Sequence, residues 1–250
     1  MTRGRCARSD SLVKPFGLTP HEAISYTGTG MTTNQKTIIQ CDFDNTVAVD
    51  DVSFMVLDTF GDKKWRDVLQ EYREGMITVG AFNRRAFSTV KADESTLLKY
   101  VRDSKVAVRR GFKDLLTYCA GKGYEFVIVS NGLDFYIKAV LKDISANNIK
   151  VFAARTTFNP AGMDVRYIGP DGSHLDAGFK ESYVNLFKGR GYRVVYIGDG
   201  SSDVSPARQA HHIFARDELL RRCKEKGLTC TPFEDFTDVR RGLERLPEQR

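Results

Sequence analysis

A short apolar run that ends in two closely spaced carboxylates is the feature that most restricts how this chain can fold. Residues 37–41 (Thr-Ile-Ile-Gln-Cys) are followed directly by Asp42-Phe43-Asp44-Asn45-Thr46. An apolar, β-branched run of this length predicts a buried strand, and residues i and i+2 of a strand share a face. Two crowded carboxylates repel each other unless a cation or a shared proton lies between them, which favours a functional site. The plainer alternative is an Asx-rich turn that only closes a strand.

Two later apolar runs end in a similar way. Residues 124–129 lead into Ser130-Asn131-Gly132, and residues 193–197 lead into a Gly-Asp-Gly-Ser-Ser-Asp segment at 198–203. Between these runs, residues 178–182 begin a helical pattern that contains Lys180. In open α/β sheets, ligands bind beyond the carboxyl ends of the strands. The sequence therefore predicts an α/β fold in which three strand ends form one site for a phosphate and a metal ion.

In this order the four segments resemble the motifs of the haloacid dehalogenase superfamily of phosphotransferases. The matching residues are the Asp-x-Asp-x-Thr at 42–46, Ser130, Lys180 and the Gly-Asp-x-x-x-Asp at 198–203. The chain is most similar to the phosphoserine-phosphatase-like branch, and within it to the 2-hydroxy-3-keto-5-methylthiopentenyl-1-phosphate phosphatases of methionine salvage. This closer similarity rests on Asp50-Asp51 and on residues 214–217 and 232–236. It implies a doubly wound, Rossmann-like parallel sheet with a small helical cap inserted after the first strand.

The resemblance also implies roles for individual residues in phosphomonoester hydrolysis. Asp42 is expected to be the nucleophile that forms an aspartyl-phosphate, and Asp44 to protonate the leaving oxygen and later activate water. Mg²⁺ is expected to bridge Asp42, the main-chain carbonyl of Asp44 and Asp199, while Asp203 either ligates through water or orients Lys180. The phosphoryl group is expected to be bound by a larger set: Thr46, Ser130, Asn131, Gly132 and Lys180.

Residues 49–107 are expected to form the cap, and residues 36–48 and 108–250 the core. Helical periodicity predicts cap helices at 51–60, 64–74, 79–90 and 93–103, separated by glycines. Asp51, Arg84 and Arg85 are the candidates for recognising the organic part of the substrate. The alternative for each is an ordinary solvated charge on a helix surface.

Three alternatives to a metabolite phosphatase of methionine salvage remain open. A phosphoserine phosphatase would require Asp51 and Arg84 or Arg85 to converge, and a nucleic-acid end phosphatase would require a basic groove. A regulatory protein without catalysis would be expected to lack Asp42, Asp44 or Lys180, and all three are present. Some of the resembled enzymes carry cysteines just before the motif lysine. Residues 171–176 of this chain contain none, which leaves the exact substrate open.

Composition and charge restrict the partners and the compartment. The net charge of +6 comes from dispersed Lys and Arg, which favours a small phosphorylated metabolite over nucleic acid. Five cysteines without a Cys-x-x-Cys spacing indicate a reducing compartment, and no apolar run is long enough for a membrane span. We expect a cytoplasmic monomer or homodimer. Residues 1–35 are expected to be a disordered leader, or to follow an upstream start codon that precedes the real start at Met31; an organelle transit peptide is the alternative.

Overall fold

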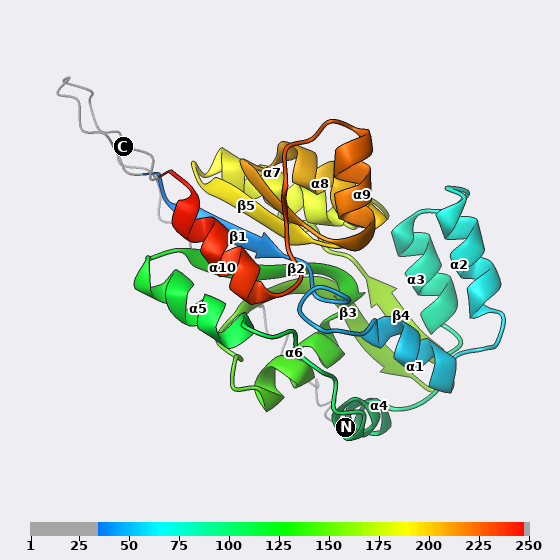
Figure 1. Cartoon of the computed structure of the whole chain (residues 1–250). Helices are drawn as coiled ribbons and strands as arrows, with labels where there is room; N and C mark the ends of the chain where they lie inside the picture. Colours follow the sequence, from blue (N-terminus) through cyan, green and yellow to red (C-terminus); the bar gives the residue numbers. More distant parts are fainter. Residues whose placement is uncertain (1–34, 248–250) are drawn as a thin grey trace, which may run out of the picture. The chain divides into compact units, whose positions relative to one another are not determined.

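Strand β1 (Thr37–Cys41) is completely buried and lies at the centre of a seven-stranded sheet in the order β4-β3-β2-β1-β5-β6-β7 (Figure 1). It pairs in parallel with β2 (Glu125–Leu133) on one side and with β5 (Arg193–Gly198) on the other. A strand that is covered on both faces is mostly apolar, as this run is, and its buried Gln40 donates to the Lys180 carbonyl at 2.8 Å. The computed structural model describes residues 35–247, so the predicted leader falls almost entirely outside the described residues.

The outer strands complete a mostly parallel sheet. Beyond β2 lies β3 (Lys150–Asn159), and beyond β5 lie β6 (His212–Ala215) and β7 (Thr231–Pro232). The exception is β4 (Gly162–Arg166), which pairs antiparallel with β3 through a hairpin at residues 159–162. The chain adds strands first on one side of β1 and then on the other, so the order reverses at β1. Such a switch point is where doubly wound sheets bind ligands, and the predicted fold class is confirmed.

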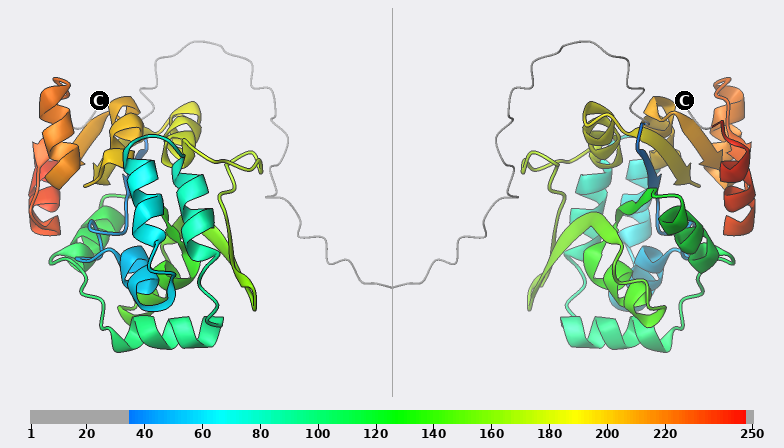
Figure 2. Two further views of the ribbon diagram at one scale, coloured as in Figure 1. Left: turned by 90° about the vertical axis from the view of Figure 1, so that its right-hand side faces the viewer. Right: turned by 90° about the vertical axis from the view of Figure 1, so that its left-hand side faces the viewer.

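Helices cover both faces of this sheet. Helices α5 (Phe112–Gly121) and α10 (Phe236–Arg245) lie on one face, where the rings of Phe112 and Phe236 pack 5.1 Å apart, and α7 (Phe179–Gly189) lies on the other (Figures 1 and 2). The remaining helices of the core are α6 (Asp134–Asp143), α8 (Val204–Gln209) and α9 (Asp217–Glu225), with a short 3₁₀ turn at Ser201–Asp203. None of the helices in residues 35–247 has the length and apolar character needed to cross a membrane.

Four helices lie between β1 and α5, as the periodicity predicts. They are α1 (Val52–Phe60), α2 (Trp65–Arg73), α3 (Val79–Phe87) and α4 (Glu94–Asp103). Asp51, Thr78 and Asp93 begin α1, α3 and α4, because the side chain of each accepts a hydrogen bond from a free backbone N–H of the first turn. Helices α2 and α3 lie side by side (Figure 2). The division into cap and core at residues 49 and 107 stays a prediction.

The four-helix segment between β1 and α5 begins and ends at two adjacent stretches, residues 47–49 and 107–109, which we call the stem. The Val49 N–H donates to the Ala107 carbonyl, and the Arg109 N–H donates to the Val47 carbonyl, each at 2.8 Å. The Arg109 side chain donates to the Thr46 carbonyl at 2.9 Å and to the Asn45 carbonyl at 2.7 Å. Asn45 has a left-handed backbone (φ 56°), which Asn tolerates better than most residues. The stem therefore holds the loop that follows β1.

Candidate active site

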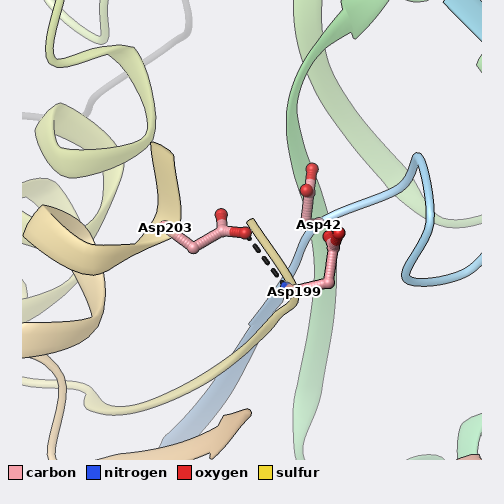
Figure 3. Close-up of side chains that lie close together, drawn as sticks. All are labelled: Asp42, Asp199 and Asp203. Carbon is pink, nitrogen blue, oxygen red and sulfur yellow. Dashed lines mark hydrogen bonds between the residues drawn. The ribbon is translucent and has the colours of Figure 1, made fainter. Parts of the chain in front are cut away.

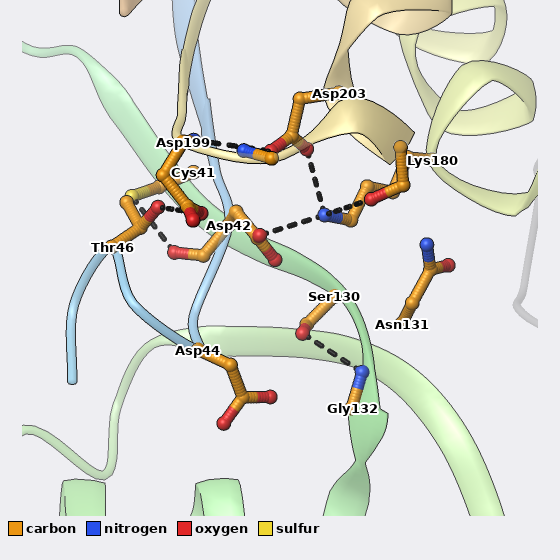
Figure 4. A network of polar contacts seen from close by, with 12 residues as sticks. Cys41, Asp42, Asp44, Thr46, Ser130, Asn131, Gly132, Lys180, Asp199 and Asp203 are labelled. Atoms are coloured by element: carbon orange, nitrogen blue, oxygen red, sulfur yellow. Dashed lines mark hydrogen bonds and ion pairs between the residues drawn. The ribbon is translucent and has the colours of Figure 1, made fainter. Parts of the chain in front are cut away.

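Asp42 lies at the carboxyl end of β1, where the strand leaves the sheet. Its N–H donates to the Ile197 carbonyl at 2.9 Å, so the backbone is still anchored to β5. One carboxylate oxygen, Oδ2, lies 2.8 Å from the ammonium of Lys180 (Figure 4). The other, Oδ1, is buried and has no hydrogen-bond partner among the described residues. A buried charged oxygen without a partner is costly, which indicates that a ligand completes the site.

Lys180 supplies the buried positive charge of the site from the first turn of α7. The side chain is 3% exposed, and its Nζ also lies 2.7 Å from Asp203 Oδ1. Burial alone would lower the pKa of Lys180, but Asp203 and Asp42 raise it above its usual value. Lys180 is therefore cationic at neutral pH, and it offsets part of the repulsion between the surrounding carboxylates.

Asp203 is a fully buried anchor whose acceptor positions are all in use. Its Oδ1 accepts from Lys180 and from the Tyr196 hydroxyl at 2.5 Å; its Oδ2 accepts from the N–H groups of Asp199 at 3.1 Å and Gly200 at 2.9 Å. A carboxylate offers about four acceptor positions, and these bonds fill them. Of the two roles expected for Asp203, the structure supports the orientation of Lys180.

Three carboxylates come close enough together to hold a metal ion. Asp42, Asp199 and Asp203 each place an oxygen within 4.8 Å of the others (Figure 3). Burial, followed by repulsion from Asp42 and Asp203, raises the pKa of Asp199 to about 8. Burial also raises the pKa of Asp42 to about 6, although Lys180 opposes this. Oxygen donors with excess negative charge and the unpartnered Oδ1 of Asp42 fit a hard divalent cation such as Mg²⁺.

Asp44 has a different environment from the other carboxylates. Its Oδ1 accepts from the Val52 N–H at 2.9 Å, and its Oδ2 accepts from the Tyr136 hydroxyl at 2.5 Å. Burial, followed by repulsion from Asp51, raises the pKa of Asp44 well above its usual value. A carboxyl group whose pKa is raised in this way holds its proton more readily, which suits it to act as a general acid.

These groups face one cavity of about 240 Å³ between the strand ends and helices α1–α3. Its polar floor is formed by seven residues: Asp42, Asp44, Ser130, Asn131, Gly132, Lys180 and Asp199. Its opposite wall carries apolar and aromatic side chains: Phe54, Leu69, Tyr72, Val79 and Phe82. Sites for small molecules have this character, with a few polar groups placed against apolar walls.

A family model described as haloacid dehalogenase-like hydrolase matches residues 39–208. The chain belongs to this family. It is 30% identical over 221 residues to a 2-hydroxy-3-keto-5-methylthiopentenyl-1-phosphate phosphatase of Bacillus velezensis, covering 84% of this chain and 91% of that protein. It is also 32% identical over 218 residues to the bifunctional enzyme MtnB/MtnX of Bacillus licheniformis, covering 86% of this chain but only about half (51%) of that protein's length. The family and these relatives together indicate that this hydrolase is a phosphatase.

Solved structures confirm the fold of the hydrolase. A phosphoserine phosphatase described as a phospho-aspartyl intermediate analogue superposes with a TM-score of 0.62 at 17% identity, covering 85% of this chain and 100% of that one. A substrate-bound phosphoserine phosphatase gives the same TM-score at 18% identity, covering 85% and 99%. At this identity the likeness shows the shared fold alone.

The predicted phosphate-binding residues of the hydrolase converge, with one exception. Ser130, Asn131 and Gly132 line the cavity floor, and the Oδ1 of Asn131 is buried without a hydrogen-bond partner. The exception is Thr46, which does not line the cavity; its hydroxyl donates to Asp199 Oδ1 at 2.8 Å. The structure therefore places Thr46 beside the cluster of Asp42, Asp199 and Asp203, because the turn after β1 directs its side chain towards β5.

The expected arginines do not reach the site. Arg84 pairs with Asp176 at 2.5 Å and Arg85 pairs with Glu71, because α3 turns Phe82, Asn83 and Ala86 inward and leaves its arginines outside. Asp51 does line the cavity, and burial raises its pKa to about 6.

The arginine that lines the cavity is Arg73, at the end of α2, which the sequence analysis did not single out. A signal was available, because Arg73 follows Leu69 by four residues and therefore lies close to the buried stripe of that helix. Tyr136 was missed as well, since an aromatic residue in a core helix usually indicates packing alone.

Proposed function

We propose that this phosphatase hydrolyses a small phosphorylated metabolite through a phosphoaspartate on Asp42, with Mg²⁺ as its cofactor. The observation that carries the proposal is the contrast between two carboxyl groups that line one cavity. Asp42 has an unpartnered buried oxygen next to Lys180, whereas Asp44 is held by two donors and has a strongly raised pKa. Carboxyl groups whose environments differ in this way suit the separate roles of nucleophile and acid.

The reaction would proceed in two steps. A carboxylate oxygen of Asp42 attacks phosphorus, the bond to the leaving oxygen breaks, and Asp44 gives its proton to that oxygen. Asp44, now ionised, takes a proton from a water molecule, which attacks the phosphoaspartate and releases inorganic phosphate. Lys180, Ser130 and the Asn131 side chain would bind the phosphoryl oxygens, which carry the charge in the transition state.

Three groups would hold Mg²⁺: the carboxylates of Asp42 and Asp199 and the main-chain carbonyl of Asp44. Thr46 would orient Asp199 through their hydrogen bond, and Asp203 would act by fixing Lys180. When bound, the cation supplies positive charge that offsets the repulsion between these carboxylates and the phosphoryl group.

We further propose 2-hydroxy-3-keto-5-methylthiopentenyl-1-phosphate as the substrate. The support is the name of several relatives together with the apolar wall of the cavity, which suits a methylthioalkyl chain. Phosphoserine is the second candidate, because Asp51 and Arg73 place opposite charges on the same cavity and match an amino acid. The convergence of Asp51 with Arg84 or Arg85 that was expected for a phosphoserine site is not formed, because these arginines pair with Asp176 and Glu71.

The deciding experiment measures phosphate release with Mg²⁺ from both candidate substrates, a sugar phosphate and an oligonucleotide 5′-phosphate. Wild type is compared with Asp42→Asn and with Asp103→Asn, a surface control at the exposed end of α4. We expect turnover of one of the two candidates that Asp42→Asn abolishes and Asp103→Asn leaves unchanged. Turnover that survives Asp42→Asn would show that the phosphoaspartate mechanism is wrong. A preference for the oligonucleotide 5′-phosphate would refute the proposal that the substrate is a small metabolite.

We also propose that the enzyme works in the cytoplasm. Cys41, Cys119, Cys223 and Cys230 are free thiols, as expected in a reducing compartment. Whether the chain is a monomer or a homodimer stays a prediction.

A further inference from the structure

We propose that Tyr136 is a positioning residue that holds Asp44 in the orientation needed for proton transfer. The inference rests on the proposed function of Asp44 as general acid and base. Tyr136 is the third residue of α6 and is completely buried. Its hydroxyl donates to Asp44 Oδ2 at 2.5 Å and lies 2.7 Å from the hydroxyl of Ser53.

The hydroxyl of Tyr136 is not needed for packing. The ring packs against Phe43 and Phe135, with centroid distances of 6.2 and 5.5 Å, and a phenylalanine ring would make the same contacts. A buried hydroxyl costs free energy unless it is hydrogen-bonded. Here it has two partners, Asp44 and Ser53, and one of them belongs to the reaction. Burial and the nearby Asp44 raise the pKa of Tyr136, so it remains a neutral phenol.

The space for this hydrogen bond depends on Gly132. A Cβ atom at this position would lie 2.1 Å from the Tyr136 hydroxyl and 2.4 Å from Asp44 Oδ2. Both distances are far below any van der Waals contact, so only glycine lets the strand end approach the pair so closely. Gly132 is thus part of the same arrangement, in addition to lining the cavity floor.

Helix α1 holds both oxygens of Asp44. The Val52 N–H binds Oδ1 directly, and Ser53 in the same turn reaches Oδ2 through Tyr136. One acceptor position on each oxygen is therefore occupied, which leaves the remaining positions for the proton that Asp44 transfers. Losing the Tyr136 hydroxyl frees the carboxyl to rotate about its side-chain torsion. A general acid that is displaced in this way loses part of its contribution to rate.

The test compares two aryl phosphates that differ in their need for an acid. p-Nitrophenolate is a good leaving group without a proton, whereas phenolate depends on one, so phenyl phosphate reports on Asp44. The kcat/KM value covers only the steps through formation of the phosphoaspartate. For Tyr136→Phe we expect kcat/KM to fall about 10- to 100-fold with phenyl phosphate and less than about 3-fold with p-nitrophenyl phosphate. The matched control is Tyr183→Phe, which removes another largely buried tyrosine hydroxyl, in α7, with a weak 3.4 Å bond to the Ile168 carbonyl.

Equal losses with both phosphates, or no loss with either, would overturn the proposal, because a purely structural defect does not distinguish leaving groups. A melting curve shows whether Tyr136→Phe folds. If Tyr136→Phe does not fold, the Ser53→Ala variant tests the proposal instead. It removes the second hydrogen-bond partner of the Tyr136 hydroxyl, while the bond between Tyr136 and Asp44 remains. We expect Ser53→Ala to lower the kcat/KM for phenyl phosphate, relative to that for p-nitrophenyl phosphate, about 2- to 5-fold. An unchanged ratio would refute the proposal. Failure of the proposed function itself would appear separately, as activity that survives Asp42→Asn.

Discussion

Asp42, the proposed nucleophile, is expected to destabilise the protein when its carboxyl group is ionised. The pKa of Asp42 rises from 3.8 to about 6 on folding, chiefly because the side chain is buried. Below about pH 3 the carboxyl is protonated in both the folded and unfolded chain, so it costs nothing. As the pH rises towards 6 the unfolded chain releases this proton first, so stability falls and the penalty is complete above pH 6. Replacing Asp42 by Asn removes it.

The size of the effect follows from the pKa. Each pKa unit is worth about 1.4 kcal/mol, so ionised Asp42 costs the metal-free protein about 3 kcal/mol above pH 6. Asp199 and Asp203 lie within the same cluster and share the repulsion. We therefore expect Asp42→Asn to raise the free energy of unfolding by about 1 to 3 kcal/mol, or roughly 2 to 10 °C in Tm.

The assay is thermal unfolding in EDTA at pH 8 and at pH 4.5, with wild type, Asp42→Asn and Asp103→Asn. The gain should be complete at pH 8 and about a third as large at pH 4.5, where the folded-state carboxyl still keeps its proton. Asp103→Asn should stay within about 0.5 kcal/mol of wild type at both values, because its side chain is exposed. With Mg²⁺ in place of EDTA at pH 8, wild type should become more stable than Asp42→Asn, since wild type binds the ion more tightly.

Two results would refute this reasoning. Asp42→Asn could be no more stable than wild type at pH 8 in EDTA, which would mean that the ion pair with Lys180 outweighs the cost of burial. Alternatively, the gain could be equal at both pH values, which would mean that it does not come from ionisation of Asp42.

Two further predictions concern residues placed by the structure. Thr46→Val removes the hydroxyl that donates to Asp199, so the Mg²⁺ concentration for half-maximal phosphate release should rise about 10-fold. The control Thr59→Val, on the exposed surface of α1, should not change this concentration. An unchanged Mg²⁺ dependence of Thr46→Val would contradict the role of Thr46. Arg73→Ala should raise KM about 10-fold with kcat nearly unchanged, because it removes binding that is equal in the ground and transition states. Arg66→Ala is the matched control on α2, and an unaltered KM for Arg73→Ala would exclude Arg73 from substrate binding.

The sequence predicted those parts of the structure that depend on local pattern. The three strands that end at or near Asp42, Ser130 and Asp199 are confirmed, as are the four helices between β1 and α5. Each of these rests on apolar periodicity, a capping residue or a turn within about ten residues of chain. The convergence of the strand ends followed from the topology of doubly wound sheets.

The parts that were missed depend on contacts between distant segments. Helical spacing can place a charged residue near a buried stripe, as it does for Arg73, but it does not say whether that residue reaches a site formed by other elements. Arg84 is held outward by Asp176, which lies 92 residues away, and Arg73 lines the cavity instead. Tyr136 reaches Asp44 across 92 residues as well. A single sequence contains no information about such pairings.

The antiparallel stem has a consequence for how substrate recognition can change. Because residues 47–49 and 107–109 lie side by side, the entry and exit of the intervening segment have a fixed separation whatever that segment contains. Other helices can be spliced between residues 61 and 106 without moving the ends to which they are joined, provided that α1 stays, because Val52 and Ser53 hold the carboxyl group of Asp44. Arg109 sets a second limit, since it secures the carbonyls of Asn45 and Thr46 from the returning side. A chimera that keeps the stem and α1 keeps these contacts around Asp44, and one that replaces Arg109 releases the loop after β1.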